Sequence, residues 1–379
     1  MPKSIAELET PALILDAGRL QRNLARMREK LERHGVALRP HVKTAKSIEV
    51  VRRALIGQPG GITVSTLKEA DQFFACGFGD ILYAVGIAPN KLDHVAALRA
   101  KGADVTVLLD SVESGRMVAD RGRALGIDFP ALIEIDSDGH RSGVRPGDPA
   151  LMAIGRVLGE GRGASLRGVM THAGDSYNCT SVDAIRAMAE RERAAVVGCA
   201  EALRGAGLPC PIISAGSTPT ATFATDFNGV TEVRAGVYMF FDLVMAGLGV
   251  CLIDDIAVSV LATVIGHQPD KGWIITDAGW MALSRDRGTA KQKVDQGYGL
   301  VCNVGGVPID NLVVVDTNQE HGIIADRRGA AIEMARYPVG TQMRILPNHA
   351  CATSAQHAAY HVVNGGTELE AVWPRFSGW

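Results

Sequence analysis

The chain has 379 residues, which is enough for one large domain and a smaller one. Its formal net charge of −2 gives no electrostatic reason to expect a nucleic acid or an anionic membrane as a partner. No apolar run approaches the roughly 20 residues that span a membrane, and the first residues lack the apolar core of a signal peptide. The 7 cysteines are an odd number scattered along the chain, so we expect reduced thiols and a cytoplasmic protein.

The N-terminal segment begins with a short apolar run at residues 12–16, which we interpret as a strand. Residues 19–33 follow with apolar side chains at helical spacing, among them Leu20, Leu24 and Leu31. From there to about residue 246, short strand-like runs alternate with amphipathic helical stretches. The eight predicted strands are 37–41, 61–65, 80–84, 104–110, 131–136, 168–172, 211–215 and 231–234.

This alternation predicts an α/β fold in which the strands pair in parallel and the helices are right-handed crossovers. Eight such units over residues 17–246 favour a (β/α)8 barrel of the TIM type. A doubly wound open sheet is the competing architecture. It would place a glycine-rich phosphate loop after the first strand, and the sequence has none there.

The pattern changes after about residue 246, because strand-like runs follow one another without long helices between them. These runs are 256–266, 272–277, 312–315, 320–325, 342–346 and 360–363. They predict a separate all-β domain over residues 247–379. The strand at 12–16 falls outside the count of eight, and we expect the N-terminal segment 1–16 to pair with this second domain.

Polar side chains gather at the predicted C-terminal ends of the barrel strands, where the active sites of such barrels lie. Lys43 follows the first strand, Arg141 follows the fifth, and His172 and Tyr177 follow the sixth. A lysine in this position can form a covalent bond with a carbonyl compound. The alternative is that Lys43 is a solvated surface charge, as most lysines are.

A short, hydroxyl-rich stretch follows the seventh strand and contains Gly216, Ser217 and Thr218. Its backbone N–H groups and hydroxyls could hold a phosphate, and Gly236 and Tyr238 after the eighth strand could add contacts. The alternative is an ordinary helix cap, because Ser-Thr-Pro commonly starts a helix.

A second candidate site lies in the predicted β domain, where His349 and Cys351 follow a strand. Two residues apart in an extended segment, the imidazole and the thiol would point to the same side and could bind one cation. A thiolate beside an imidazole favours zinc or a late transition metal. The alternative is a partly buried histidine beside an inert cysteine.

Taken together, these segments resemble a known family. TPALILD, RPHVKT, DGHRSGV, GSTPT, EVRAGVY and PNHACAT occur in the order typical of the D-serine dehydratase and D-threonine aldolase group of alanine-racemase-fold enzymes, which depend on pyridoxal 5′-phosphate (PLP). The resemblance runs from Thr10 to Trp379. It implies a PLP-binding barrel, a β domain that carries a divalent metal, a small-molecule amino acid substrate and a homodimer.

The resemblance also implies roles for the candidate residues. It implies that Lys43 holds PLP as a Schiff base and removes the Cα proton, and that His172 packs against the pyridine ring. It places Arg141 near the cofactor's phenolate oxygen or a substrate carboxylate. It places Tyr177 close to the cofactor ring or the substrate. The phosphate would be held by Gly216, Ser217, Thr218, Gly236 and Tyr238. The metal, zinc, manganese or cobalt, would be bound by His349 and Cys351.

The pair His-x-Cys is typical of the dehydratases of this group, whereas the aldolases have His-x-Asp. The resemblance therefore implies dehydration of a 3-hydroxy amino acid, with D-threo-3-hydroxyaspartate favoured and D-serine as a further substrate. Two alternatives stay open. One is retro-aldol cleavage of D-threonine or 3-hydroxy-D-aspartate at the same site, and the other is a non-catalytic PLP-binding module.

Overall fold

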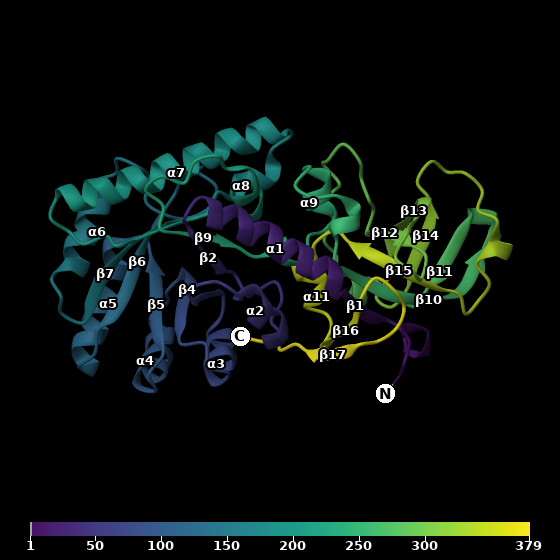
Figure 1. Cartoon of the computed structure of the whole chain (residues 1–379), viewed down its shortest axis with the longest axis horizontal. Helices are drawn as coiled ribbons and strands as arrows, with labels where there is room; N and C mark the ends of the chain where they lie inside the picture. The colour runs from purple at the N-terminus through teal and green to yellow at the C-terminus, as the bar shows by residue number, and fades with distance from the viewer. Residues whose placement is uncertain (1) are drawn as a thin grey trace. The chain divides into compact units, whose positions relative to one another are not determined.

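The computed structural model describes residues 2–379 and divides into two compact units. The first, here called the barrel unit, consists of Arg26–Gly236 and residues 378–379. The second, here called the β unit, consists of Val237–Ser377 and the N-terminal residues up to Ala25. Figure 1 shows the elements of both units.

The barrel unit is built on an 8-stranded parallel sheet in the order β2-β9-β8-β7-β6-β5-β4-β3. A parallel bridge between His41 and Thr63 joins the two ends of this order, so the sheet is nearly closed. The predicted (β/α)8 barrel is therefore confirmed. The strands are β2 (Ala37–Pro40), β3 (Ile62–Val64), β4 (Asp80–Gly86), β5 (Asp104–Leu109), β6 (Phe129–Ile135), β7 (Ala164–Thr171), β8 (Ile212–Ala215) and β9 (Glu232–Ala235).

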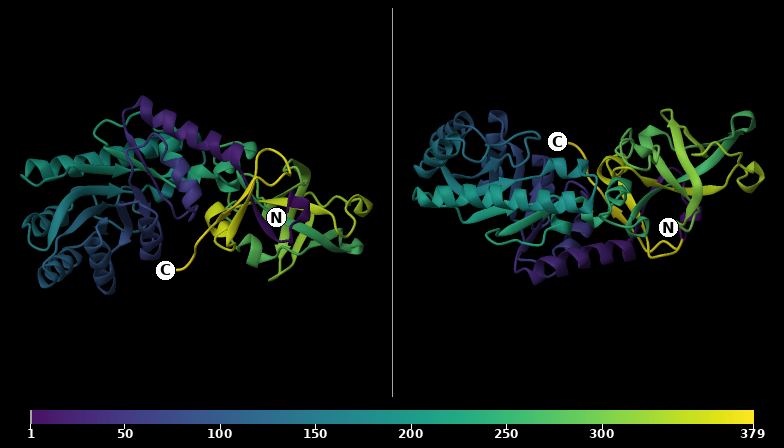
Figure 2. Two further views of the ribbon diagram at one scale, coloured as in Figure 1. Left: turned by 60° about the horizontal axis from the view of Figure 1, so that its bottom comes forward. Right: turned by 90° about the horizontal axis from the view of Figure 1, so that it is seen from above.

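Helices alternate with these strands and lie outside them, as α4, α5 and α6 do beside β4 to β7 in Figure 1. Every residue of β6 is buried, as expected for a parallel strand with helices on one face and the barrel interior on the other. The helices are α1 (Ala17–Arg33), α2 (Ile48–Ala54), α3 (Leu67–Ala75), α4 (Leu92–Ala100), α5 (Val112–Leu125), α6 (Ala150–Gly159), α7 (Val182–Gly205) and α8 (Thr218–Phe223). Figure 2 shows the long helix α7, in teal, along its length in both views.

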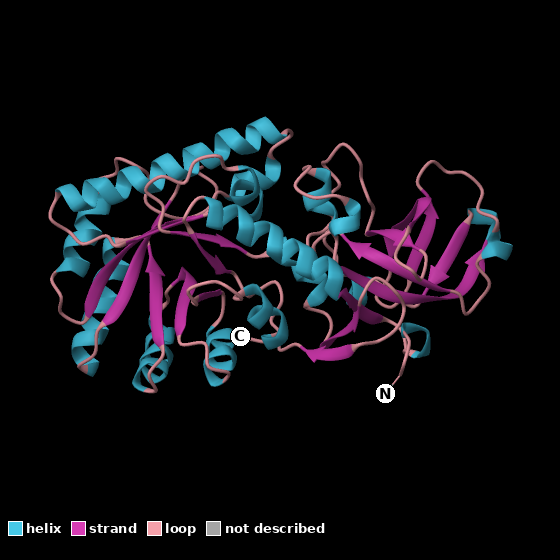
Figure 3. Ribbon diagram, viewed as in Figure 1, coloured by secondary structure: helices cyan, strands magenta, loops and turns pink. Residues whose placement is uncertain are grey.

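The β unit contains a 9-stranded sheet in the order β11-β14-β13-β12-β15-β10-β1-β16-β17. A further pairing of β11 with β10 closes its first six strands into a ring of antiparallel neighbours. Figure 3 shows the strands of the chain in magenta. The strands are β1 (Ala12–Asp16), β10 (Val258–Gln268), β11 (Trp273–Thr276), β12 (Gly299–Cys302), β13 (Pro308–Thr317), β14 (Gly322–Asp326), β15 (Gln342–Pro347), β16 (Ala359–Val363) and β17 (Ala371–Pro374).

Strand β1 lies between β10, with which it pairs antiparallel, and β16, with which it pairs in parallel. The expectation that the first strand joins the second domain is confirmed. All five residues of β1 are buried, which fits a central strand. The sequence did not predict β12 and β17, which have four residues each.

Three short helices accompany this sheet: α9 (Leu243–Gly247), α10 (Trp280–Leu283) and α11 (Ala350–Ser354). Among residues 2–379, no helix is both long enough and apolar enough to cross a membrane.

Candidate functional site

Three of the predicted site residues meet at the C-terminal ends of the barrel strands. Lys43 lies in the turn after β2 and is exposed. Burial lowers the pKa of the His172 imidazole to about 3, and the positive charges of Lys43 and Arg141 act in the same direction. Lys43 and Arg141 therefore lie close enough to His172 to interact with it, although they follow different strands. Burial, with these charges acting in the same direction, keeps His172 neutral at physiological pH.

The His172 imidazole is fixed by a hydrogen bond between its Nδ1 and the carbonyl oxygen of Gly216, 3.2 Å apart. A carbonyl oxygen can only accept, so Nδ1 carries the proton and Nε2 is left with a lone pair. The ring of Tyr177, from the 3-10 turn Gly174–Asn178, lies with its centroid 6.4 Å from that of His172. The structure thus places the Tyr177 ring near that of His172.

The hydroxyl-rich stretch after β8 is a turn that leads into helix α8. Ser217 caps this helix, because its Oγ accepts from the Thr220 N–H while Thr220 Oγ1 accepts from the Ser217 N–H. Ser217 Oγ also lies 2.9 Å from the hydroxyl of Ser176. The helix cap considered from sequence is present, so the Ser217 and Thr220 hydroxyls already have partners within the protein.

Two glycines allow three strand ends to approach one another. Gly216 has a φ of +122°, and a Cβ there would lie 2.6 Å from the carbonyl oxygen of Arg234. At Gly236, a Cβ would lie 2.9 Å from Thr44 Oγ1 and 3.1 Å from the carbonyl oxygen of His41. Gly236 is therefore required by its packing against the turn that carries Lys43. The ends of β2, β8 and β9 converge because neither glycine has a side chain.

Tyr238 lies in the 3-10 turn Val237–Met239, two residues after Gly236, and its side chain is completely buried. Burial raises the pKa of its phenol, so Tyr238 is neutral at physiological pH.

Sequence reasoning missed two buried charged residues below these strand ends. Arg234 donates to the Ser214 hydroxyl at 2.6 Å and to the Thr171 carbonyl at 2.5 Å, and burial lowers its pKa to about 10. Glu192, from α7, accepts from the backbone N–H groups of Ala173 and Gly216. Arg234 could have been suspected from its place in the EVRAG segment. Glu192 had no distinguishing signal in a helix with several glutamates.

His349 and Cys351 lie at the start of a helix, so the predicted extended segment was wrong. His349 has extended dihedral angles and is the N-cap of α11, whereas Cys351 is the second residue of that helix. His349 lies at the N-cap, outside the regular helix, and the Cys351 thiol hydrogen-bonds its imidazole. The two donors therefore share one location although the conformation that unites them differs from the predicted one.

Two aspartates that sequence reasoning did not single out surround this pair. Asp286, in the loop after α10, has its Oδ2 2.8 Å from His349 Nδ1. Asp242 caps α9 by accepting from the Met245 N–H, and it also accepts from the Ala350 N–H at the start of α11. Burial lowers the pKa of His349, but Cys351, Asp286 and Asp242 outweigh it and raise that pKa to about 11.

The donor set at His349 fits a divalent metal with an open coordination sphere. With Nδ1 engaged by Asp286, Nε2 is the imidazole atom left for a metal, beside the Cys351 sulfur. Within residues 2–379, no group of three or more His, Cys, Asp or Glu side chains is arranged to hold a metal ion. The pair would therefore bind a metal only with water or substrate as further ligands, as catalytic sites do.

One further feature of the strand ends would be explained by a bound group. His41 Nδ1 is enclosed and has no hydrogen-bond partner in the described part of the chain. Burial, followed by the charges of Lys43 and Arg234, lowers the pKa of His41 well below its usual value. A polar atom left without a partner beside an exposed lysine is a feature that a bound group would explain.

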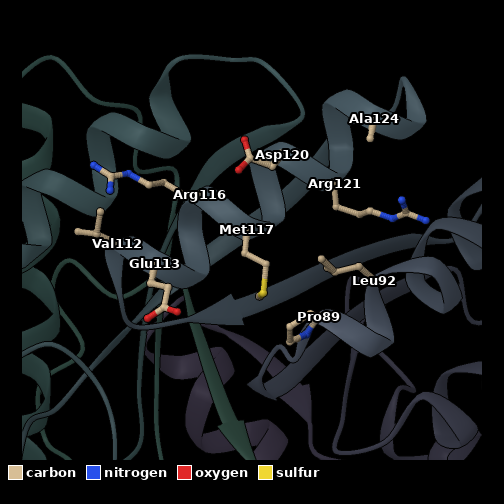
Figure 4. Close-up of a pocket in the computed structure, with 9 residues that line it drawn as sticks. All are labelled: Pro89, Leu92, Val112, Glu113, Arg116, Met117, Asp120, Arg121 and Ala124. Atoms are coloured by element: carbon tan, nitrogen blue, oxygen red, sulfur yellow. The ribbon is translucent and has the colours of Figure 1, made fainter.

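A separate groove lies on the helical face of the barrel unit, between α4 and α5 (Figure 4). Leu92 and Met117 point toward one another across it, and Arg116, Asp120 and Arg121 lie along its rim. The groove contains none of the residues described above.

The sequence matches two known families in order along the chain. Residues 15–244 match the alanine racemase N-terminal domain, and residues 257–363 match the putative serine dehydratase domain. This chain belongs to the serine dehydratase family of alanine-racemase-fold proteins. PLP is the cofactor expected of that fold family.

Named relatives match this chain over nearly all of its length. The chain is 55% identical to D-threo-3-hydroxyaspartate dehydratase of Delftia sp. strain HT23, and the match covers 100% of both chains. The solved structure of that enzyme superimposes with a TM-score of 0.97 over 100% of each chain. D-serine dehydratase of Dictyostelium discoideum is 31% identical over 96% of each chain. 3-Hydroxy-D-aspartate aldolase of Paracoccus denitrificans is 26% identical, covering 97% of this chain and 92% of its own.

Proposed function

We propose that this chain is a PLP- and divalent-metal-dependent lyase that converts 3-hydroxyaspartate, preferably the D-threo isomer, to oxaloacetate and ammonia. D-serine, which would give pyruvate and ammonia, is the second substrate that we expect. The observation that carries the proposal is the 55% identity, over the full length, to a D-threo-3-hydroxyaspartate dehydratase. The cysteine Cys351 in the His-x-Cys motif agrees with it.

The residues at the barrel strand ends would hold PLP. Lys43 supplies the amine that bonds to the cofactor's aldehyde, and neutral His172 would pack against the ring. The turn at Gly216, Ser217 and Thr218, with Gly236 and Tyr238, would enclose the phosphate. This assignment is supported by the convergence of the three strand ends and by the partnerless His41 Nδ1.

PLP, when bound, supplies an electron sink that makes the substrate's Cα proton acidic. The Lys43 amine would be the base that takes this proton. The positive charge of Arg141 near His172 suits a substrate carboxylate or the cofactor's phenolate oxygen. Tyr177, whose ring centroid lies 6.4 Å from that of His172, would border the same site.

His349 Nε2 and the Cys351 thiolate would hold the metal, and a divalent ion there supplies Lewis-acid assistance to a departing hydroxyl. Hydroxide is a poor leaving group, so dehydration depends on this assistance. A thiolate ligand favours zinc, with manganese and cobalt as the alternatives. A solved cysteine-to-alanine variant of a D-threo-3-hydroxyaspartate dehydratase is described as being in the metal-free form, which is consistent with an enzyme that binds a metal.

Loss of the β-hydroxyl leaves an enamine, which on release hydrolyses to the keto acid and ammonia. The water lost in the first step is regained in the second, so 3-hydroxyaspartate yields oxaloacetate and ammonia in equal amounts. Retro-aldol cleavage would instead break the Cα–Cβ bond and give glycine and glyoxylate. The aldolase relative makes this the second candidate, and Cys351 in place of aspartate counts against it.

The test is product analysis with a panel of substrates. The holoenzyme is incubated with the D- and L-, threo- and erythro-isomers of 3-hydroxyaspartate, with D-serine and with D-threonine, each with and without a chelator. The proposal predicts chelator-sensitive release of oxaloacetate from D-threo-3-hydroxyaspartate as the fastest reaction. Glycine with glyoxylate as the main products would refute dehydration, and turnover of none of these compounds would refute the assignment as a whole.

A further inference from the structure

Helix α7 carries a buried charge on a face that is otherwise apolar. Its buried residues recur every three or four positions, as expected for an amphipathic helix. Glu192 lies in the middle of this face, is 2% exposed, and is the charged residue among apolar neighbours such as Met188, Ala189 and Val196. Burying a carboxylate is costly unless its oxygens are hydrogen-bonded, so its contacts call for an explanation.

Glu192 joins two loops that follow different strands. Its Oε1 accepts from the Ala173 N–H at 2.9 Å, directly after His172, and from the Gly216 N–H at 3.1 Å, directly after β8. The hydroxyl of Thr220, in α8, hydrogen-bonds the same carboxyl group. One side chain therefore links the loop of His172 to the turn that leads into α8.

The His172 side chain makes a second connection between the same two loops. His172 Nδ1 hydrogen-bonds the carbonyl oxygen of Gly216, and the next residue, Ala173, donates to Glu192. Both backbone polar groups of Gly216 are thus committed within the protein. Its N–H points to Glu192 and is not a donor for a phosphate. Gly216 serves the site by fixing the turn, and the carboxylate of Glu192 determines where that turn lies relative to the His172 ring.

We propose that Glu192 is a positioning residue that sets the His172 ring and the turn at residues 216–220 in the relative arrangement that binds PLP. It touches neither cofactor nor substrate and acts through backbone hydrogen bonds. The inference rests on the PLP site of the proposed function. It predicts that loss of the acceptor weakens recognition of the cofactor's phosphate more than recognition of its ring, because the turn is displaced while Lys43 is not.

The experiment compares PLP with pyridoxal, which lacks the phosphate, in the full-length protein. The variant Glu192→Leu removes the acceptor at similar size, Glu192→Gln keeps an Oε1 acceptor, and Glu201→Leu is the matched control at an exposed position of the same helix. The Kd of each ligand is measured by fluorescence quenching, and the ratio of the two Kd values reports phosphate recognition. A defect in folding alone would weaken both ligands equally.

Glu192→Leu is expected to reduce the PLP-over-pyridoxal preference by about tenfold, the equivalent of one hydrogen bond. Glu192→Gln and Glu201→Leu are expected to keep it within about threefold of the wild type. An unchanged preference in folded Glu192→Leu, or an equal loss in Glu192→Gln, would overturn the proposal.

If Glu192→Leu does not fold, Glu192→Asp replaces it. Aspartate keeps the charge but is one methylene too short to reach both loops, so its phosphate preference should fall below that of Glu192→Gln. The reverse order would show that charge, and not reach, is what matters, and would overturn the proposal. A wild-type protein that binds no PLP would overturn the proposed function and this inference together. A wild type that prefers PLP while its variants behave like it would overturn only the inference.

Discussion

The two candidate sites of this protein, one in each unit, are assembled in different ways. In the barrel unit, Lys43, Arg141 and His172 come from separate strand ends and are brought together by the barrel topology. In the β unit, the candidate metal ligands His349 and Cys351 are two residues apart at the start of one helix, and Asp286 orients the histidine from 63 residues away. In the barrel, the alternation of strands and helices predicts where the site residues lie. In the β unit, the short His-x-Cys motif identifies the candidate ligands but does not indicate the residues that support them.

The most damaging change to the candidate site in the barrel unit is Lys43→Ala. We expect turnover to fall by at least about 10³-fold, because both the bond to the cofactor and the base are lost. The visible absorbance of the lysine-bound cofactor should disappear, while the zinc content measured by atomic absorption stays at the wild-type level. A variant that retains the visible band would show that another lysine carries PLP.

The corresponding change in the β unit is Cys351→Ala, which should reverse this pattern. Loss of the thiolate is expected to abolish stoichiometric zinc binding and to lower dehydration by at least about 10²-fold, while the visible band of the bound cofactor remains. Cys351→Ser is the matched control of similar size, and it should be equally defective because a hydroxyl is a poor zinc ligand. Full activity of Cys351→Ala in a zinc-free buffer would contradict the metal assignment.

A smaller effect is expected from Asp286→Ala, which leaves both candidate ligands in place. His349 would lose the acceptor that fixes its tautomer, and zinc affinity should fall by about 10- to 100-fold. Competition with a chromophoric chelator measures this affinity without reference to activity. Asp295→Ala, in the same loop region and paired with Arg287 at the surface, should leave zinc affinity unchanged.

The mildest expected effect is the pH dependence of stability that His172 causes in the barrel unit. The pKa of His172 is about 3 in the folded protein, against 6.5 for an ordinary histidine, so the unfolded chain binds the proton more tightly. The stability that neutral His172 provides is present above pH 6.5 and is lost as the pH falls toward 3. Urea unfolding of the cofactor-free protein at pH 7 and pH 4.5 should show a larger loss for the wild type than for His172→Asn, whose Nδ2 can keep the bond to Gly216.

The difference between the repeated units of the barrel and the irregular β unit explains which elements could be predicted from the sequence. The eight barrel strands were located because buried parallel strands read as continuous apolar runs between amphipathic helices. The four-residue strands β12 and β17 were missed, although β2 and β8 are equally short. The barrel strands were located because they alternate with helices, and no such alternation marks the strands of the β unit. The His349 segment was read as extended because α11 has only five residues and its start resembles a strand end.

The supporting residues lay beyond sequence reasoning for a different reason. Glu192 contacts residues 19 and 24 positions away, and Asp286 contacts one 63 positions away. Such contacts exist only once the chain has folded, and neither acidic residue differs in its local sequence from the many that lie on the surface. The candidate donors themselves could be named from sequence, because the chemistry requires particular residue types at strand ends.

The most direct test of the account is which bond of 3-hydroxyaspartate breaks and whether a metal is required. The holoenzyme is given D-threo-3-hydroxyaspartate, and ammonia, oxaloacetate, glycine and glyoxylate are quantified together before chelation, after chelation and after zinc is restored. We predict equal amounts of oxaloacetate and ammonia, loss of both on chelation and recovery with zinc. Release of glycine with glyoxylate, or oxaloacetate production that survives complete removal of the metal, would contradict the account.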